Sequence, residues 1–159
     1  MLRKIISGAQ NGADIAGLKV AKKYGLETGG IMPFGYKTLD GPRPEYKAEY
    51  GVNVHNSSSY VPRTRANVRD SDGTIRFAFN FESRGEVCTL KAINDYSRPH
   101  LDVDLNNPIS ATAIAEWLGA NKIEVLNVAG NSEATSPGTE EATMPILDEV
   151  LRILSKEKP

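Results

Sequence analysis

Short apolar runs alternate along this chain with segments of helical periodicity, and this alternation constrains the fold more than any other feature of the sequence. Strands are expected at Ile5-Ile6, around Gly30–Met32, and over residues 75–79, 100–105 and 122–128. Strands that alternate with helices are joined by right-handed crossovers and form a mostly parallel sheet covered on both faces. The sequence therefore predicts an α/β protein with three layers, in which helices flank a sheet of about five strands.

Helices are expected between these strands and after the last one. They cover about residues 14–24 and 85–96, the stretch from Asn107 to Leu118, and a final stretch from Ser136-Pro137 or Thr139 to about Ser155. Asn107 followed by Pro108 is typical of a helix cap and the first helical position. Pro145 lies within the last segment, so we expect it to kink that helix or to delay its start.

The chain has 159 residues, a length that fits one domain, and we expect residues 1–159 to form it. The stretch from about 33 to 61 differs from the rest because it is rich in proline, glycine and serine. A loop of this length inside a compact domain is usually a lid, a binding loop or a mobile segment. The sequence therefore predicts one domain with a long loop at about 33–61.

Composition narrows the expected partners and compartment. Nineteen basic residues against twenty acidic ones give a net charge of -1, so no overall charge attracts the chain to nucleic acid or to an anionic membrane. No apolar stretch is long enough to span a bilayer, and the N-terminus begins with a strand rather than a secretion signal. The single cysteine, Cys88, has no partner for an internal disulfide. We expect a cytoplasmic protein that binds neither nucleic acid nor membrane.

The first strand ends in a glycine-containing loop, Gly8-Ala9-Gln10-Asn11-Gly12, and a helix begins at about Asp14. Such a loop turns backbone N–H groups toward a ligand, and the helix N-terminus adds a dipole that favours an anion. The spacing matches neither the P-loop nor G-x-G-x-x-G. The alternative is a tight turn in which glycine only permits close packing. In open parallel sheets, ligands bind beyond the carboxyl ends of the strands, which is where this loop falls.

The segment RTRANVRDSDGT, residues 63–74, is a second candidate. If it is helical, Arg65 and Arg69 stack one turn apart and can hold a phosphate or carboxylate together. A calcium loop opening at Asp70 would need glutamate at its twelfth position, where Phe81 stands, so we exclude an EF-hand. The alternative for Asp70 and Asp72 is a capped helix end and turn.

The segment NFESRGEVCT, residues 80–89, follows another strand and opens another helix. Glu82 and Glu86 are its only carboxylates that could act as acid or base, and no acid–base partner is evident. Cys88 is expected to be a buried structural cysteine rather than a thiol acidified by the helix N-terminus. The two histidines, His55 and His100, lack metal-binding spacing, so no protein-built metal site is expected.

Together these blocks resemble the molybdenum-cofactor carrier family, a circularly permuted branch of the Rossmann-like superfamily that includes YpsA and the LOG proteins. The family pattern S-G-G-Q-T-G-V-D is similar to residues 7–14, SGAQNGAD. Thr28-Gly29-Gly30, Pro33, Gly35 and Asp40-Gly41 follow in order, then residues 67–74, NVRDSDGT, and residues 126–130, LNVAG. The resemblance covers nearly the whole chain and implies a Rossmann-like fold.

Two departures from the family pattern bear on the ligand. The second glycine of the first loop is Ala9, which limits how closely a phosphate can approach the backbone there. The family's G-G-T after the central strand is replaced by Arg84-Gly85-Glu86. A glutamate that faces a phosphate is repulsive, whereas Arg84 compensates for that charge.

The resemblance implies a binding protein without catalytic residues or protein metal ligands, which holds the molybdenum cofactor (molybdopterin), or a related nucleotide or phosphate, at the strand ends. The partners that the resemblance implies for the protein are this small anionic ligand and molybdoenzymes. The resemblance also favours a homo-oligomer. In this reading the glycine loop holds the phosphate, and the 33–61 loop covers the site. The implied binding residues are Gly8, Ala9, Gln10, Asn11, Gly12, Asp14, Gly29, Gly30, Arg69, Ser71, Asp72, Ser83, Arg84, Gly85, Glu86 and Thr89.

Two alternatives remain open at the level of sequence. The first is an enzyme that hydrolyses the N-glycosidic bond of a nucleoside monophosphate, as LOG-type relatives do, with Glu86, Glu82 or Asp72 as the acid or base. The absence of an intact P-G-G-x-G-T-x-x-E block counts against it. The second is a nucleotide sensor, which differs from a carrier only in its partners.

Overall fold

The centre of the fold is a strand whose side chains are buried on both faces. In this computed structural model, which describes residues 1–157, all six residues of β5 (Gly73–Ala78) are buried. It pairs in parallel with β7 (Val125–Gly130), which in turn pairs with β1 (Lys4–Ile6). Strands buried on both faces are typical of parallel sheets covered by helices. The sheet therefore needs a helical layer on each side.

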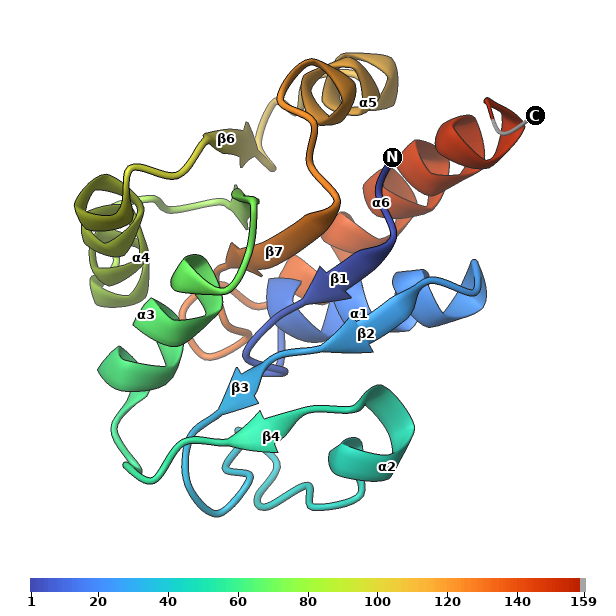
Figure 1. Cartoon of the computed structure of the whole chain (residues 1–159). Helices are drawn as coiled ribbons and strands as arrows, with labels where there is room; N and C mark the ends of the chain where they lie inside the picture. The colour runs from blue at the N-terminus through green and yellow to red at the C-terminus, as the bar shows by residue number, and fades with distance from the viewer. Residues whose placement is uncertain (158–159) are drawn as a thin grey trace.

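Five strands form this sheet, in the order β2-β1-β7-β5-β6, and every pairing is parallel (Figure 1). The edge strands are β2 (Glu27–Gly29) and β6 (His100–Asp104). Ile5 of β1 lies opposite Thr28 on one side and Leu126 on the other. Because β1, β7 and β5 are neighbours and run the same way, the loops that follow them meet at one edge of the sheet.

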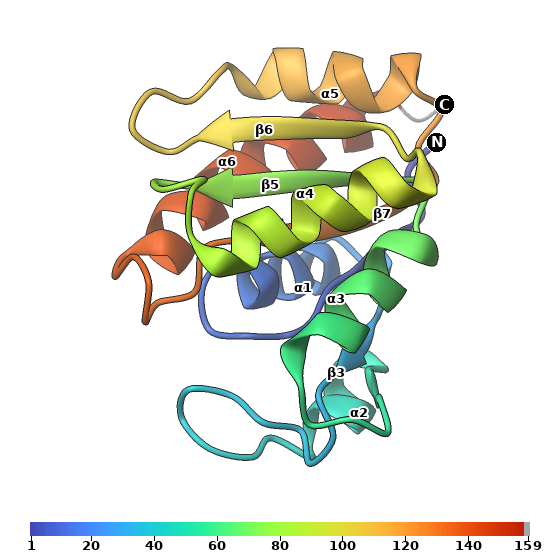
Figure 2. The same ribbon diagram turned by 90° about the vertical axis from the view of Figure 1, so that its left-hand side faces the viewer.

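Helices cover both faces and confirm the predicted three-layer, Rossmann-like fold (Figure 2). Helices α3 and α4 pack together on one face, whereas α1 and α5 both pack against α6 on the other. Phe77, Ile5 and Val128 lie fully buried between the layers. The bounds of these helices are α1 Ala13–Lys23, α3 Tyr60–Arg69, α4 Arg84–Tyr96, α5 Ala111–Ala120 and α6 Thr139–Lys156.

The stretch predicted as a long loop at about 33–61 contains regular structure. It holds α2 (Tyr46–Tyr50) and β4 (Asn53–Val54), and α3 begins at its end. Strand β4 pairs with β3 (Ile31–Met32) to form a separate two-stranded sheet. Met32, Tyr50 and Val52 bury a second, smaller core against α1. Strand β3 was predicted around Gly30–Met32, whereas α2 and β4 were not, because they are only five and two residues long and lie in a stretch rich in proline and glycine.

Gly30 separates β2 from β3 and redirects the chain from the large sheet to the small one. Its φ is 126°, and a Cβ atom at this position would lie 2.0 Å from the carbonyl oxygen of Ser7. Only glycine fits such a conformation and such a close approach. This packing against the first loop accounts for the glycine at residue 30.

The start of one predicted helix differs from the structure, and the start of another agrees with one of its two predicted positions. Helix α5 begins at Ala111, and the Ser110 hydroxyl caps it by accepting a hydrogen bond from Ala113 N at 3.1 Å. The predicted cap at Asn107 is wrong because Asn107 N donates to Asp104 O in a turn that follows β6. Helix α6 begins at Thr139 and continues through Pro145. Within residues 1–157, no helix is long and apolar enough to cross a membrane.

Candidate functional site

A pocket of about 440 Å³ lies beyond the carboxyl ends of β1, β7 and β5. The glycine loop forms one wall, and the first turns of α4 form another. One face of α3 and the residues that follow β7 complete the pocket. This volume is within the usual range for small-molecule sites.

Hydrogen bonds within the glycine loop hold it in one conformation. The Ser7 hydroxyl donates to Asp14 O at 2.9 Å and accepts from Ala9 N at 3.1 Å. Ala9 is buried with a φ of 53°, a left-handed conformation that is uncommon for alanine. Gly12, whose φ is 126°, lets the loop contact the segment after β7, because a Cβ there would lie 2.3 Å from Asn131 O. Ala9 is therefore accommodated where the family pattern has glycine.

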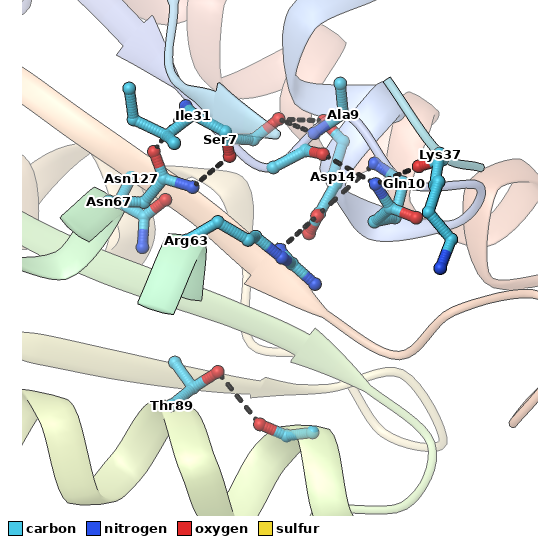
Figure 3. Close-up of polar contacts among 12 residues, drawn as sticks. Ser7, Ala9, Gln10, Asp14, Ile31, Lys37, Arg63, Asn67, Thr89 and Asn127 are labelled. Atoms are coloured by element: carbon cyan, nitrogen blue, oxygen red, sulfur yellow. Dashed lines mark hydrogen bonds and ion pairs between the residues drawn. The ribbon is translucent and has the colours of Figure 1, made fainter. Parts of the chain in front are cut away.

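A buried carboxylate already occupies the first turn of α1. Asp14 accepts hydrogen bonds from Gln10 N at 3.4 Å and from Arg63 Nη1 at 3.3 Å (Figure 3). Burial raises the pKa of the Asp14 carboxyl, and the positive charge of Arg63 opposes that rise. The helix N-terminus that was predicted to face a phosphate thus faces its own aspartate. Arg63 is the cation on this side of the pocket.

Arg63 belongs to a face of α3 that the sequence reading did not identify. Tyr60, Arg63, Thr64 and Asn67 follow the helical spacing of three and four residues, and all line the pocket. The buried Nε atom of Arg63 has no hydrogen-bond partner within the described part of the chain. Its guanidinium carbon lies 5.3 Å from the centre of the Tyr60 ring. The sequence spacing of these four residues indicates that they share one helix face, but it does not show that this face lines the pocket.

Glu86, in the first turn of α4, is the second buried carboxyl of the pocket. Glu86 is only 2% exposed. Burial raises the pKa of its carboxyl to about 7, although the nearby Arg76 guanidinium acts to lower that pKa. Its Oε2 atom lies 3.5 Å from Asn131 Nδ2. Its Oε1 atom has no hydrogen-bond partner among residues 1–157. The pocket therefore contains a buried acceptor that the described chain does not satisfy.

Arg76 fixes the backbone of this turn from within β5. Its Nη1 donates to Glu86 O at 3.0 Å, while Nε and Nη2 donate to the two carboxylate oxygens of Asp102 at 2.8 and 2.6 Å. A bidentate pair of this kind holds both side chains in one orientation. Arg76 therefore positions Glu86 but is not available to neutralise its side chain directly.

Asn131 joins the exits of β5 and β7. Its Oδ1 accepts from Phe79 N at 2.9 Å and Asn80 N at 3.0 Å, and its Nδ2 donates to Asn80 O at 2.8 Å. The strongest bonds of this amide are thus to backbone atoms. Asn131 shapes the wall beside Glu86 and contributes only the long 3.5 Å contact to that carboxyl.

The segment after Pro33 lies over the glycine loop. Gln10 Nε2 donates to Lys37 O at 2.9 Å, and Asn11 Nδ2 donates to Asp40 Oδ2 at 2.8 Å. Between these two attachments, the side chain of Leu39 lines the pocket. Figure 3 shows Gln10 reaching the backbone of Lys37. The polar residues of the glycine loop thus hold part of the 33–61 segment at the mouth of the pocket.

The structure brings together many, but not all, of the predicted binding residues. Ala9 and Gly12 belong to the glycine loop without lining the pocket, and Gly29 and Gly30 lie at the junction of β2 and β3. Thr89 lines the pocket although its hydroxyl donates to Gly85 O at 2.9 Å. The predicted residues that line the pocket are Gly8, Gln10, Asn11, Asp14, Ser83, Arg84, Gly85, Glu86 and Thr89.

Arg69, Ser71 and Asp72 do not lie at this pocket. They come directly before β5 and therefore lie at the amino ends of the strands, opposite the ligand edge. Asp72 Oδ2 accepts from Glu124 N and Val125 N at the start of β7, and the Ser71 hydroxyl donates to Val68 O. The prediction that they lie beside the other binding residues is therefore wrong. They close the turn between α3 and β5.

The arginines expected to share an anion are each engaged elsewhere. Arg65 pairs with Asp95 at 3.0 Å, and Arg69 pairs with Asp70 at 2.8 Å. Cys88 lines the pocket, and burial raises the pKa of its thiol, so the helix N-terminus does not acidify it. No group of three or more histidine, cysteine, aspartate or glutamate side chains suited to a metal ion occurs in residues 1–157.

Comparisons with known proteins agree with this architecture. Residues 5–151 match the model of the Circularly permutated YpsA SLOG family. The fold is similar to the crystal structure of a protein from Syntrophus aciditrophicus SB named "Putative molybdenum carrier protein", with 36% identity, 94% of each chain covered and a TM-score of 0.84. A search of curated proteins finds no significant match. The family match spans well over half of the chain, so the chain belongs to the circularly permutated YpsA SLOG family.

Proposed function

We propose that this protein binds an anionic, nucleotide-like cofactor in the pocket at the strand ends, and that the cofactor is the molybdenum cofactor. The observation that carries the proposal is that one pocket contains both a buried donor and a buried acceptor without partners. The donor is a guanidinium N–H of Arg63, and the acceptor is a carboxylate oxygen of Glu86; neither has a partner in the described chain. A molybdopterin carries a phosphate for the first and ring N–H groups for the second. The name of the Syntrophus protein supports this choice of ligand.

The residues present fit such a ligand in size and charge. A pocket of about 440 Å³ accommodates a bicyclic or tricyclic ring with one phosphate. Arg63 and Arg84, on opposite walls, supply positive charge for the phosphate. Leu39 and Tyr60 supply apolar surface at the pocket mouth. A bound cofactor would bring its metal on its own dithiolene sulfurs, so the protein would need to supply only the binding surface.

Each wall of the pocket has its own role in binding this ligand. Arg63 contacts the phosphate, because Asp14 accepts from only one of its N–H groups and Nε remains unpaired by residues 1–157. The side chain of Glu86 contacts the ring. The segment around Leu39 covers the ligand, since Gln10 and Asn11 connect it to the loop at the pocket wall.

A second candidate function is hydrolysis of the N-glycosidic bond of a nucleoside monophosphate. The observation that favours it is the pKa of about 7 that burial gives Glu86, because an acid–base catalyst is most effective when its pKa is near the working pH. Release of free base from nucleoside monophosphates, abolished by Glu86→Gln, would support this function. Absence of release with a panel of nucleoside monophosphates would exclude it for those substrates.

The experiment that tests the first proposal is identification of the ligand that the protein retains. The protein is purified gently from its native host and denatured, and the extract is oxidised. Pterin fluorescence and mass are then measured together with molybdenum content. A pterin present at one per chain, and lost from an Arg63→Gln variant purified in the same way, is the expected result. An ordinary nucleotide in place of a pterin would contradict the assignment to the molybdenum cofactor.

A further inference from the structure

We infer that Glu86 selects ligands whose ring carries two adjacent N–H donors, the 2-amino-4-oxo-pyrimidine edge that pterins share with guanine. This inference rests on the proposed function and specifies the end of the ligand opposite the phosphate. It excludes adenine-type rings as preferred ligands. It therefore narrows the general class of nucleotide-like anions to one chemical subclass.

Glu86 has a carboxylate oxygen without a hydrogen-bond partner among residues 1–157. Glu86 lines the pocket and is 2% exposed, yet its Oε1 atom accepts no hydrogen bond from residues 1–157. Buried polar atoms in native proteins are nearly always paired, and an exception calls for a missing partner. A ligand in the adjoining pocket is well placed to provide that partner.

The two guanidinium groups near Glu86 do not pair with its side chain. From α3, Arg63 donates to Asp14 of α1, and from β5, Arg76 donates to Asp102 of β6 and to the backbone oxygen of Glu86. Neither guanidinium makes a hydrogen bond to the Glu86 side chain. The missing partner of this carboxylate must therefore come from outside the described residues as an N–H or O–H donor.

The weak contact from Asn131 to Glu86 sets how many hydrogen-bond donors the ligand needs. Its Nδ2 bonds to Asn80 O at 2.8 Å and reaches Glu86 Oε2 only at 3.5 Å. Oε1 is thus unpaired within the described chain and Oε2 is weakly paired. A carboxylate with two accepting oxygens is complementary to two parallel N–H groups. In guanine these are N1–H and the 2-amino group, and in a pterin they are N3–H and the 2-amino group.

Adenine-type rings do not complement an ionised carboxylate in this position. Adenine presents an amino donor beside the acceptor N1, so an ionised carboxylate gains one hydrogen bond and meets one repulsive lone pair. A site that hydrogen-bonds one edge rejects a ring lacking that edge, because buried polar groups are then left unpaired. The ionised form of Glu86 consequently favours guanine and pterin. Affinity for these rings rises with pH as Glu86 ionises. The negative charge of Asp14 opposes this ionisation, and the positive charge of Arg76 favours it.

The test is a set of binding measurements by titration calorimetry on the whole chain freed of bound ligand. The probes are GMP, neopterin monophosphate, AMP and ribose 5-phosphate, which carries the phosphate but no ring. For the wild-type protein at about pH 8, GMP and neopterin monophosphate are expected to bind at least about tenfold more tightly than AMP. Glu86→Gln is expected to remove this preference and to leave the affinity for ribose 5-phosphate unchanged.

Glu82→Gln is the matched control, because Glu82 lies four residues earlier, is exposed and does not line the pocket. It makes the same change in charge and should retain the full preference. The wild-type affinity for GMP should rise more between about pH 6 and pH 8 than that for AMP, because the phosphate of both ligands ionises in this range and ionised Glu86 favours GMP alone. This pH profile tests the inference even if Glu86→Gln fails to fold.

The outcomes separate this inference from the proposed function. Equal or tighter binding of AMP than of GMP and the pterin overturns the inference, while retained binding of ribose 5-phosphate leaves the anion site intact. Preference for both two-donor rings supports it, and the tighter of the two identifies the source of the ring. A guanine preference combined with no retained pterin supports the role of Glu86 and contradicts the molybdenum cofactor as ligand. Failure of all four probes to bind overturns the inference and the proposed anion site together.

Discussion

At the scale of single residues, Gly12 is a position where the backbone admits no side chain. Its φ is 126°, and a Cβ would lie 2.3 Å from Asn131 O, a backbone atom that cannot move aside without shifting the exit of β7. We predict that Gly12→Ala lowers the free energy of unfolding by about 2 kcal/mol or more. Urea denaturation followed by far-UV circular dichroism measures this change.

Gly119→Ala is the matched control for that prediction. Gly119 lies in α5, and a Cβ there meets no atom within 4 Å. The same substitution should therefore stabilise the protein by about 0.5–1 kcal/mol, because alanine is the better helix former. If Gly12→Ala proved as stable as the wild-type protein, the close approach between the glycine loop and the segment after β7 would be wrong.

Glu86 also links stability to pH. Its pKa is raised from 4.5 to about 7 by burial, so the folded state binds its proton more tightly than the unfolded state. The neutral carboxyl stabilises the fold fully below about pH 4.5, and this contribution is lost as pH rises through about 7. Glu86→Gln cannot ionise. We predict that its free energy of unfolding increases by about 3 kcal/mol relative to that of the wild-type protein as pH rises between these limits.

Urea denaturation of both proteins at several pH values measures this difference. Glu82→Gln serves as the control. Because Glu82 is exposed, the difference in the free energy of unfolding between this variant and the wild-type protein should vary little with pH. A difference between Glu86→Gln and the wild-type protein that stays constant across this range would show that burial does not perturb Glu86.

The sequence predicted individual site residues only in part. Glu86 was identified because it follows a strand and begins a helix, which is a local pattern. Arg63 was missed because its role depends on which face of α3 turns toward α1, and tertiary packing sets that face. Arg69 was misplaced because the sequence does not show that the turn before β5 lies at the opposite edge of the sheet.

At the scale of elements, Asn67 connects α3 to the small sheet. Its Oδ1 accepts from Ile31 N at 2.8 Å and its Nδ2 donates to Ile31 O at 3.0 Å, so one amide satisfies both backbone groups of a residue in β3. Its own residue is only 2% exposed. We predict that Asn67→Ala destabilises the protein by about 2 kcal/mol, because it leaves both groups without partners.

Hydrogen exchange distinguishes this local effect from a general loss of stability. The amides of Ile31 and Asn53 should exchange faster in Asn67→Ala, since Asn53 N donates to Gly30 O beside the clamped residue. Asn121→Ala is the control, because its side chain bonds only to Trp117 O on the exposed end of α5. Unchanged exchange at β3 would show that pairing with β4 alone holds the small sheet.

The elements themselves were predictable where hydrophobic periodicity extends over several residues. Strands β1, β5, β6 and β7 and helices α1, α4 and α6 follow directly from that pattern. Strand β3 was predicted around Gly30–Met32, but β2, β4 and α2 were not, because elements of two to five residues carry too little periodicity. The start of α5 was misplaced because Asn107-Pro108 and Ser110 both fit a cap, and only the turn bond from Asn107 N to Asp104 O decides between them.

At the scale of the whole molecule, the question is whether the small sheet folds as part of the same unit as the large one. Strands β2 and β3 are separated only by Gly30, and the small core of Met32, Tyr50 and Val52 packs on Ile15 and Leu18 of α1. Helix α1 therefore contributes to both cores. This sharing supports the proposal that residues 1–159 form a single domain.

We predict that the protein unfolds in one cooperative transition. Trp117, the single tryptophan, lies on α5 against the main core and reports on the large sheet through its fluorescence. Urea-dependent hydrogen exchange of peptides spanning β3, α2 and β4 reports on the small sheet. Two-state unfolding requires that both probes give the same midpoint. A lower midpoint for the small sheet would show that it opens as a separate unit.

Ligand binding should move both midpoints together. A ligand that binds only the folded state stabilises it by about 2.7 kcal/mol at a concentration of about 100 times its dissociation constant. The pocket is lined from both parts of the chain, by Glu86 and Asn131 at the large sheet and by Leu39 in the segment that leads to α2. We therefore expect the retained ligand to raise the Trp117 midpoint and the small-sheet midpoint equally. A shift confined to the Trp117 signal would show that the 33–61 segment does not cover the bound ligand.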